Sequence, residues 1–185
     1  MTRVDVDVVR SVRPEPRAAV EELWRSLRQR HPDALPVAAI FFCDGLYPLQ
    51  DLADALRARF VCPLMGCTSG SQIGPEGFQR GGISLLACYG EALRLSPHLI
   101  EPLGEAPAAV ERIAQRMAEQ PPGAGRRRFG LLLVDGLRQG EERLAHALYH
   151  GLGDVPFIGG SASDEMRFEH TPVYFEGRFR SNAAV

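Results

Sequence analysis

The sequence predicts an α/β fold built from two similar halves, and three observations support this prediction. A short apolar strand ends in Asp-Gly at Asp44 and again at Asp135, and each is followed by a helix and a second strand. The glycines that open the loops after these second strands, Gly66 and Gly159, keep nearly the same spacing from the two aspartates. With 185 residues, 45 % of them hydrophobic and 24 % charged, the chain has the size and composition of one soluble globular domain.

We therefore expect internally duplicated units of strand, helix, strand, helix, strand and strand, with repeat one at about residues 1–90 and repeat two at about 91–185. A strand-helix-strand crossover gives parallel, right-handed pairing in nearly all proteins. The expected architecture is one or more mixed, largely parallel sheets with pseudo-twofold symmetry between the repeats.

Hydrophobic spacing predicts the elements of the first repeat. Alternating valines indicate a strand over 3–9, and Val20, Leu23 and Leu27 fall on one face of the helix that follows. The remaining elements are predicted as a strand over 37–43, a helix over about 49–60, a strand over 61–66, a glycine-rich loop over 70–82 and a strand over 83–89.

The second repeat is predicted in the same way. Gly90-Glu91 is expected to join strand 83–89 to a strand over 92–100 as a hairpin. The elements after it are a helix carrying Val110, Ile113 and Met117, a strand over 129–134, a helix over 140–151 and a strand over 155–159. A final hairpin is predicted to begin at Val173, turn at Glu176-Gly177 and continue to Val185.

Composition and charge exclude several classes of function. The net charge is -2, which gives no general attraction to nucleic acid or to an anionic membrane. The sequence contains no lysine, so Schiff-base chemistry and a P-loop lysine are excluded. No apolar run approaches the roughly 18 residues of a spanning helix, and we expect neither nucleic acid nor a membrane as partner and a cytoplasmic location.

The four cysteines do not form a metal-binding pattern. Cys43, Cys62, Cys67 and Cys88 include no CxxC pair and have no histidine at zinc-site spacing, so no metal is expected. Reduced thiols packed as small hydrophobic groups are the expectation for three of them. Cys67 is expected in a glycine-led loop, where its thiol could contact a ligand.

The loops after the strands are the predicted ligand-binding site, because loops at the carboxyl ends of neighbouring parallel strands meet at one edge of a sheet. Glycine allows close backbone approach, hydroxyls donate and accept hydrogen bonds, and aspartate accepts from an ammonium group. The predicted ligand-binding residues are Asp44, Gly45, Gly66, Cys67, Thr68, Ser69, Asp135, Gly136, Gly160, Ser161, Ser163 and Asp164. Asp-Gly is also a common turn in which the aspartate bonds its own backbone, so a purely structural role stays open.

Known catalytic patterns are missing from these loops. Neither loop reads G-x-S-x-G, and the sequence has no GxGxxG that opens a helix. His146 and His150 are four residues apart, a spacing that can bind a metal, but both are predicted to face solvent. We therefore expect a binding domain and not an enzyme, with no catalytic residues.

At these residues the chain is similar to a known family, the N-terminal FIST domain, named from F-box and intracellular signal transduction proteins. The similarity covers nearly the whole chain. It is carried by the two Asp-Gly turns, by Met65-Gly66-Cys67-Thr68-Ser69-Gly70, by Ile158-Gly159-Gly160-Ser161-Ala162-Ser163-Asp164 and by the Phe175-Glu176-Gly177 hairpin.

The resemblance implies a bacterial sensory domain that binds a small ligand such as an amino acid. It also implies a C-terminal FIST-type domain as partner, or signalling proteins such as histidine kinases or chemotaxis receptors. The C-terminal partner domain is absent from this sequence, and we expect the chain to be a fragment of a longer protein.

Two alternatives to ligand sensing stay open. Some relatives are haem proteins that sense nitric oxide, so haem is a possible cofactor by resemblance; otherwise no cofactor is expected. The more distant alternative is a cysteine-dependent hydrolase or transferase that uses Cys67 with Asp44.

Overall fold

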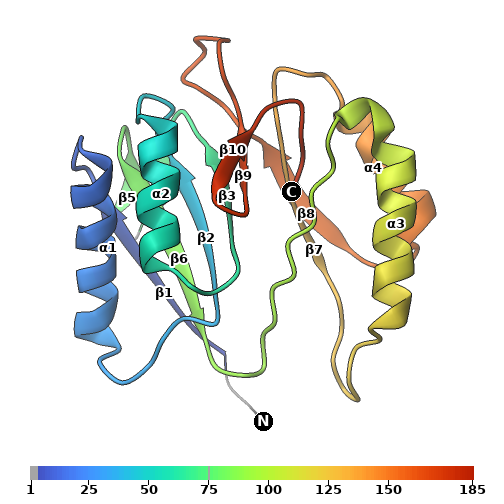
Figure 1. Ribbon diagram of the computed structural model, residues 1–185, viewed down its shortest axis with the longest axis horizontal. Coiled ribbons are helices and arrows are strands. Elements are labelled where there is room, and N and C mark those ends of the chain that lie inside the picture. The colour runs from blue at the N-terminus through green and yellow to red at the C-terminus, as the bar shows by residue number, and fades with distance from the viewer. Residues whose placement is uncertain (1–3, 75) are drawn as a thin grey trace.

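The computed structural model describes residues 4–74 and 76–185, and it has two sheets side by side with a pair of helices on each (Figure 1). The larger sheet has six strands in the order β1-β6-β2-β3-β9-β10. Their bounds are Asp5–Ser11 (β1), Ile83–Tyr89 (β6), Ala38–Cys43 (β2), Leu64–Thr68 (β3), Val173–Phe175 (β9) and Arg178–Arg180 (β10). Helices α1 (Pro16–Arg30) and α2 (Leu49–Arg59) cover one face of this sheet.

The second sheet pairs β7 (Gly130–Val134) with β8 (Phe157–Ser161) in parallel. Helices α3 (Ala106–Glu119) and α4 (Glu141–Leu152) pack against each other beside it, after the short helix η1 (Leu103–Glu105). A two-stranded hairpin of β4 (Gln72–Gly74) and β5 (Gly77–Gln79) projects from the first half. Most of the predicted elements are therefore confirmed, with bounds shifted by a few residues.

Three groups of buried side chains form the core. One lies between α1, α2 and the large sheet and includes Leu23, Phe41 and Leu56; a second lies between α3, α4 and β7. The third joins the two sheets and contains Cys67 of β3, Leu133 of β7 and Val185. The two halves are thus packed together through β3, and the carboxyl terminus lies between them (Figure 1).

The start of α1 shows how local sequence fixes an element. The Glu15 carboxylate accepts hydrogen bonds from the Arg17 amide at 2.9 Å and from the Ala18 amide at 2.5 Å. Pro16, whose fixed φ suits the first helical turn, follows this cap directly.

The predicted hairpin between strand 83–89 and strand 92–100 is wrong. β6 instead pairs antiparallel with β1 on one side and β2 on the other. In the described part of the chain, residues 92–100 form no strand, and only Ile100 makes an isolated bridge, to Ala184. Pro97 lacks a backbone donor, which disfavours regular pairing within this segment.

The sheet is mixed but not largely parallel. Within the large sheet as described, the β2–β3 pairing is parallel, whereas β1–β6, β2–β6, β3–β9 and β9–β10 are antiparallel. β6 lies between β1 and β2 and pairs antiparallel with both, which is why antiparallel pairing prevails in this sheet. The pseudo-twofold relation between the repeats and the repeat boundaries stay predictions.

Two predicted segments contain residues that lie outside the described part of the chain. Strand β1 begins at Asp5, and Arg3, the first residue of the predicted strand over 3–9, lies outside the described residues. The predicted loop over 70–82 contains the β4–β5 hairpin, and Pro75 within it also lies outside the described residues.

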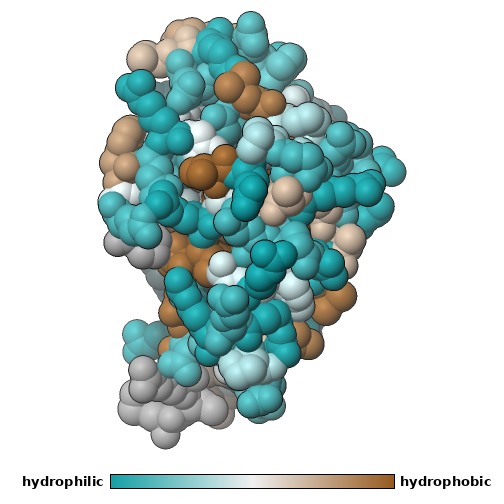
Figure 2. All heavy atoms as spheres, turned by 90° about the vertical axis from the view of Figure 1, so that its left-hand side faces the viewer, coloured by the Kyte–Doolittle hydropathy of each residue, from teal (hydrophilic) through white to brown (hydrophobic). Residues whose placement is uncertain are grey.

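The hydropathy of the surface fits a chain in which 24 % of the residues are charged. The side of the molecule formed by α1 and β1 is mainly hydrophilic, with separate hydrophobic patches (Figure 2). None of the helices in residues 4–74 and 76–185 is long and apolar enough to cross a membrane.

Candidate ligand-binding site

The turn at Asp44 and the end of β3 lie side by side, as the sequence predicts. Cys43 is paired with Thr68 in the parallel register of β2 and β3, so Asp44 and Ser69 leave neighbouring strands at one edge. The Ser69 amide donates to the Cys43 carbonyl at 2.8 Å. Asp44, Gly45 and Thr68 therefore share one rim of the large sheet, here called the first rim.

Asp44 is mostly buried but keeps one oxygen available. Its Oδ1 accepts a hydrogen bond from the Leu46 amide at 2.8 Å. Its Oδ2 receives no hydrogen bond from the described residues, and a Cβ placed on Gly81 would lie 3.6 Å from this oxygen. The carboxylate is thus fixed by its own turn while one acceptor remains open.

Arg167 is the cation of the first rim, and sequence reasoning missed it. Its Nη2 lies 3.7 Å from Oδ1 of Asp44, which is longer than a normal hydrogen bond. The same nitrogen would lie 3.4 Å from a Cβ on Gly45, and Nε donates to the Asp164 carbonyl at 2.9 Å. No motif signals Arg167, because its place depends on the conformation of a loop from the other half of the chain.

Asp164 holds that loop in shape. Its carboxylate, 4 % exposed as a residue, accepts hydrogen bonds from the backbone amides of Phe168 (3.0 Å), Glu169 (2.7 Å) and His170 (3.1 Å). Burial raises the pKa of Asp164, but these hydrogen bonds and the charge of Arg167 outweigh that effect, so its pKa lies below the ordinary value. Asp164 therefore organises the loop instead of offering a free carboxylate.

The backbone of this loop is strained at three positions. Glu165, Met166 and Phe168 all have positive φ, between 58° and 62°. Non-glycine residues adopt this region at a cost, so surrounding contacts must compensate. The three hydrogen bonds to Asp164 supply those contacts.

Ser163 and Gly70 join the loop to the first half. The Ser163 amide donates to the Thr68 carbonyl at 3.1 Å, and the Gly70 amide donates to Ser163 Oγ at 2.9 Å. A Cβ on Gly70 would lie 2.9 Å from the amide nitrogen of Glu165, so the two loops touch at Gly70. The Arg167 loop is thereby hydrogen-bonded to the end of β3 and to the residues that follow it.

Thr68 is fully buried, and its hydroxyl has no hydrogen-bond partner among the described residues. Its Cβ would lie 3.9 Å from a Cβ on Gly45, so the side chain borders the first rim. A buried hydroxyl without a partner costs free energy and calls for an explanation. Ser69 is different, because its hydroxyl donates to the Ser71 carbonyl.

The prediction that Cys67 lies in a loop with an exposed thiol is wrong. β3 extends to Thr68, two residues further than expected, and Cys67 is buried in the core between the two sheets. Burial raises the pKa of the Cys67 thiol to about 12, so it is neutral and poorly nucleophilic at pH 7. Gly66 also has a packing role, because a Cβ there would lie 2.5 Å from the Phe41 carbonyl oxygen.

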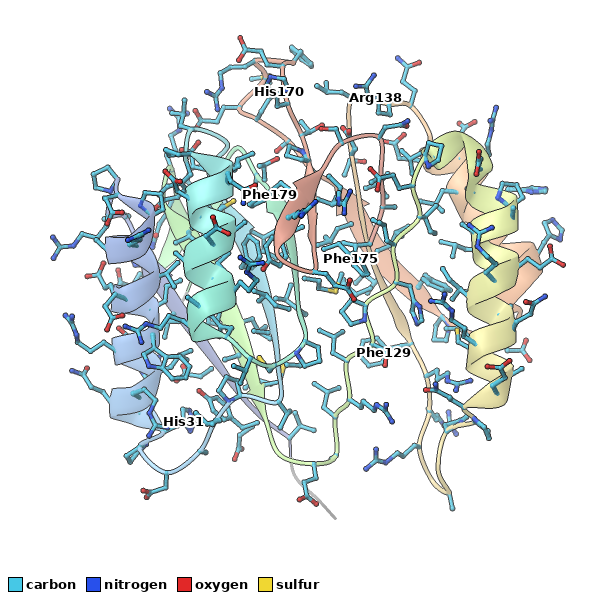
Figure 3. The ribbon with its side chains drawn as sticks, viewed as in Figure 1. His31, Phe129, Arg138, His170, Phe175 and Phe179 are labelled. Atoms are coloured by element: carbon cyan, nitrogen blue, oxygen red, sulfur yellow. The ribbon has the colours of Figure 1, made fainter. Side chains whose placement is uncertain are left out.

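The corresponding turn at Asp135 is here called the second rim. Both carboxylate oxygens of Asp135 accept hydrogen bonds from other residues of the chain. Oδ1 of Asp135 accepts from Thr171 Oγ1 at 2.5 Å and from the Leu137 amide at 3.2 Å. Oδ2 accepts from the Asn182 amide at 2.6 Å, and Arg138 Nε lies 3.8 Å away. Arg138 and His170 both lie at this edge of the molecule (Figure 3).

The other predicted residues of the second rim differ in exposure. A Cβ on Gly136 would lie 2.4 Å from the Ala162 carbonyl oxygen, so Gly136 is required for packing. Gly160 faces open space, and Ser161 is exposed, its hydroxyl donating to Glu141 at 2.8 Å. The second rim therefore offers exposed strand residues but no free carboxylate.

Haem does not fit a cavity that the described residues form beside a histidine. This cavity, next to His98, has a volume of about 70 Å³ and is lined by Arg112 and Arg116. Pockets for drug-sized ligands measure about 300–1,000 Å³. His146 and His150 are exposed on α4, as predicted, with ring centroids 4.2 Å apart, so neither is enclosed as an axial ligand would be.

Comparison with known protein families identifies the class. A family model for the FIST N domain matches residues 37–185, most of the chain. The chain belongs to the FIST N domain family, a family of sensory and signalling domains. Comparison with curated proteins and with solved structures gave no match.

Proposed function

We propose that this protein is a small-ligand-binding sensory domain for intracellular signal transduction and that its ligand binds at the first rim. The observation that carries the proposal is that an open Asp44 oxygen and the Arg167 guanidinium lie around Gly45, next to the buried side chain of Thr68, whose hydroxyl has no partner among the described residues. These groups come from both halves of the chain. We propose an amino acid or a related small polar molecule as the ligand.

The two charged groups have specific roles in this proposal. The open oxygen of Asp44 would accept from the ligand's ammonium group, and Arg167 would donate to its carboxylate. Arg167 and Asp44 are 3.7 Å apart, so a ligand carboxylate could compete for the guanidinium without breaking a short ion pair. Gly45 leaves the backbone accessible between them.

We propose that binding occurs without turnover. The Cys67 thiol is buried and its pKa is raised to about 12, so the activated nucleophile of a cysteine-dependent enzyme is missing at that position. Arg167 and Asp44 are suited to holding opposite charges.

The same contacts support a route for the signal. A ligand on Arg167 would act on the loop that Asp164 holds, and that loop is bonded to β3 through Ser163. We propose that a C-terminal FIST-type domain or a signalling protein, such as a histidine kinase or chemotaxis receptor, detects the change.

We also infer the pseudo-twofold relation between the repeats from matched hydrogen bonds that backbone amides donate at the two rims. The Asp44 amide donates to Gly82, and the Asp135 amide to Ala183, at 2.8 and 2.9 Å. The other matched pairs are Leu46 to Asp44 Oδ1 with Leu137 to Asp135 Oδ1, and Ser69 to Cys43 with Ala162 to Val134. A duplication accounts for the same pattern of hydrogen bonds at the first rim and the second rim.

A thermal-shift screen of the complete chain with the common amino acids and small carboxylates tests the proposal. A ligand raises the melting temperature by binding only the folded state. We expect at least one compound to stabilise the wild type and the control Arg138→Gln but not Arg167→Gln, because only Arg167 belongs to the first rim. A screen without any stabilising compound, or one in which Arg167→Gln responds like the control, would contradict the proposal.

A further inference from the structure

A small cavity lies between the extended segment before η1 and helix α3. It has a volume of about 70 Å³, and its wall contains His98 and Leu99 on one side and Ala109, Arg112, Ile113 and Arg116 of α3 on the other. Arg112 and Arg116 are one helical turn apart, so their side chains emerge on the same face of α3. None of these residues belongs to the first rim or the second rim.

Neither arginine of this cavity has an acidic partner in the part of the chain that the structure describes. Within the described residues, neither Arg112 nor Arg116 forms an ion pair or a side-chain hydrogen bond. His98 is half-buried, and its burial together with the charge of Arg116 lowers its pKa, which favours a neutral imidazole at pH 7. Two positive charges and a neutral donor therefore line the same small space.

A groove in the first half provides an internal comparison. It lies between β1 and α1, has a volume of about 220 Å³, and also has two arginines in its wall, Arg10 and Arg30. Here each arginine has an acidic partner: Arg10 pairs with Glu76, and Arg30 pairs with Asp7 at 2.6 Å. The same kind of groove is thus charge-balanced in the first half and unbalanced in the second.

Buried apolar side chains on one side of the α3 cavity strengthen the attraction between the arginines and an anion. Ala109 and Ile113 are buried, at 3 % and 8 % exposure, so one side of the cavity is apolar protein. Interactions with a charge held against such a surface are stronger than in open water. A guanidinium also binds phosphate or carboxylate oxygens with two parallel hydrogen bonds.

We propose that His98, Arg112 and Arg116 form a binding site for a phosphate group. The cavity volume of about 70 Å³ is well below the roughly 300–1,000 Å³ of pockets for drug-sized ligands, which favours one small anion or the anionic end of a larger molecule as the occupant. Inorganic phosphate and a phosphate monoester share this chemistry. The paired arginines would hold the oxygens, and His98 would add one hydrogen bond from the opposite wall.

Titration of the complete chain with inorganic phosphate, against chloride at matched ionic strength, tests this proposal. We expect a saturable rise in melting temperature and a shift of the His98 imidazole signal in the NMR spectrum. Arg112→Gln and Arg116→Gln should each weaken binding by roughly tenfold or more, because a hydrogen bond to a charged group is lost. Arg143→Gln removes an exposed arginine from α4 and is the matched control, expected to bind as the wild type does.

Parallel titration with phenyl phosphate distinguishes the two sources of the group. Tighter binding of the monoester would assign the site to the end of a larger molecule, whereas tighter binding of inorganic phosphate would assign it to the free ion. An equal response in all four proteins would show general screening and overturn the proposal, as would the lack of any saturable change. Both arginines are exposed, so the variants should fold, and their melting temperatures without phosphate check this.

Discussion

The turns at Asp44 and Asp135 share their backbone hydrogen bonds but differ in what surrounds the carboxylate. Asp135 is bonded on both oxygens, by Thr171, Leu137 and Asn182. Asp44 is bonded on one oxygen and faces Arg167 at a longer distance. The turn at Asp135 therefore stabilises the fold, whereas the turn at Asp44 is part of the candidate binding site. A motif that occurs twice in a sequence does not need to have the same role both times.

The largest expected effect is on Asp135. Removing a buried carboxylate that satisfies several donors should cost about 3–5 kcal/mol in the free energy of unfolding for Asp135→Ala. Asp44→Ala should cost about 1.5 kcal/mol or less, because a single backbone hydrogen bond is lost. Urea unfolding of both variants measures this difference, and equal losses would remove the distinction between the rims.

The next effect is a dependence of stability on pH through Asp164. Its pKa is lower in the folded state than the ordinary value of 3.8, so its contribution is complete above that value and is lost as the pH falls through the lower folded pKa. Asp164→Asn should cost about 1.5–3 kcal/mol at pH 7 and clearly less near pH 3. Urea unfolding at the two pH values tests this, and a cost that does not change with pH would show that the charge is not what holds the loop.

Glycine substitutions test whether the packing beneath the two rims is alike. A Cβ would lie 2.5 Å from the Phe41 carbonyl oxygen at Gly66 and 2.0 Å from the Leu132 carbonyl oxygen at Gly159. Gly66→Ala and Gly159→Ala should each cost about 1–3 kcal/mol by overpacking. Gly160→Ala is the control, because a Cβ there meets nothing within 4 Å. Thermal unfolding that finds all three variants equal would contradict this description of the strands.

The smallest expected effect is on thiol reactivity. Burial raises the pKa of Cys67 to about 12, and Cys62, which is only partly buried, has a raised pKa of about 11. Iodoacetamide should therefore modify Cys62 before Cys67 in the folded protein, both more slowly than a free thiol. Peptide mass mapping over time measures the order. Rapid labelling of Cys67 would support the enzyme hypothesis instead.

The sequence patterns predicted the local elements well because hydrophobic period and turn residues act over short distances. Helices α2 and α4 and the hairpin that turns at Glu176-Gly177 form close to the predicted residues. The order of the strands was not predictable in the same way. β6 lies between β1 and β2 through contacts between distant segments, and nothing in residues 83–100 signals that placement.

The candidate site was predicted only in part, because some of its contacts follow from neighbouring strands and others join distant segments of the chain. The proximity of Asp44 and Thr68 follows from two neighbouring parallel strands, and the structure confirms it. Arg167 could not be found, because only the fold of its loop around Asp164 brings it to Asp44. The sequence predicts the last three residues, 183–185, in a terminal hairpin, whereas they lie between Ile100 and β7.

The most direct test of the central claim is a map of backbone amide NMR shifts on addition of the compound that stabilises the protein most in the screen. We expect the changed signals to cluster at Leu46, Ser69 and the Arg167 loop, with Leu137 and Arg138 unaffected. Changes confined to the second rim, or spread evenly over both halves, would contradict a binding site made by Asp44, Thr68 and Arg167.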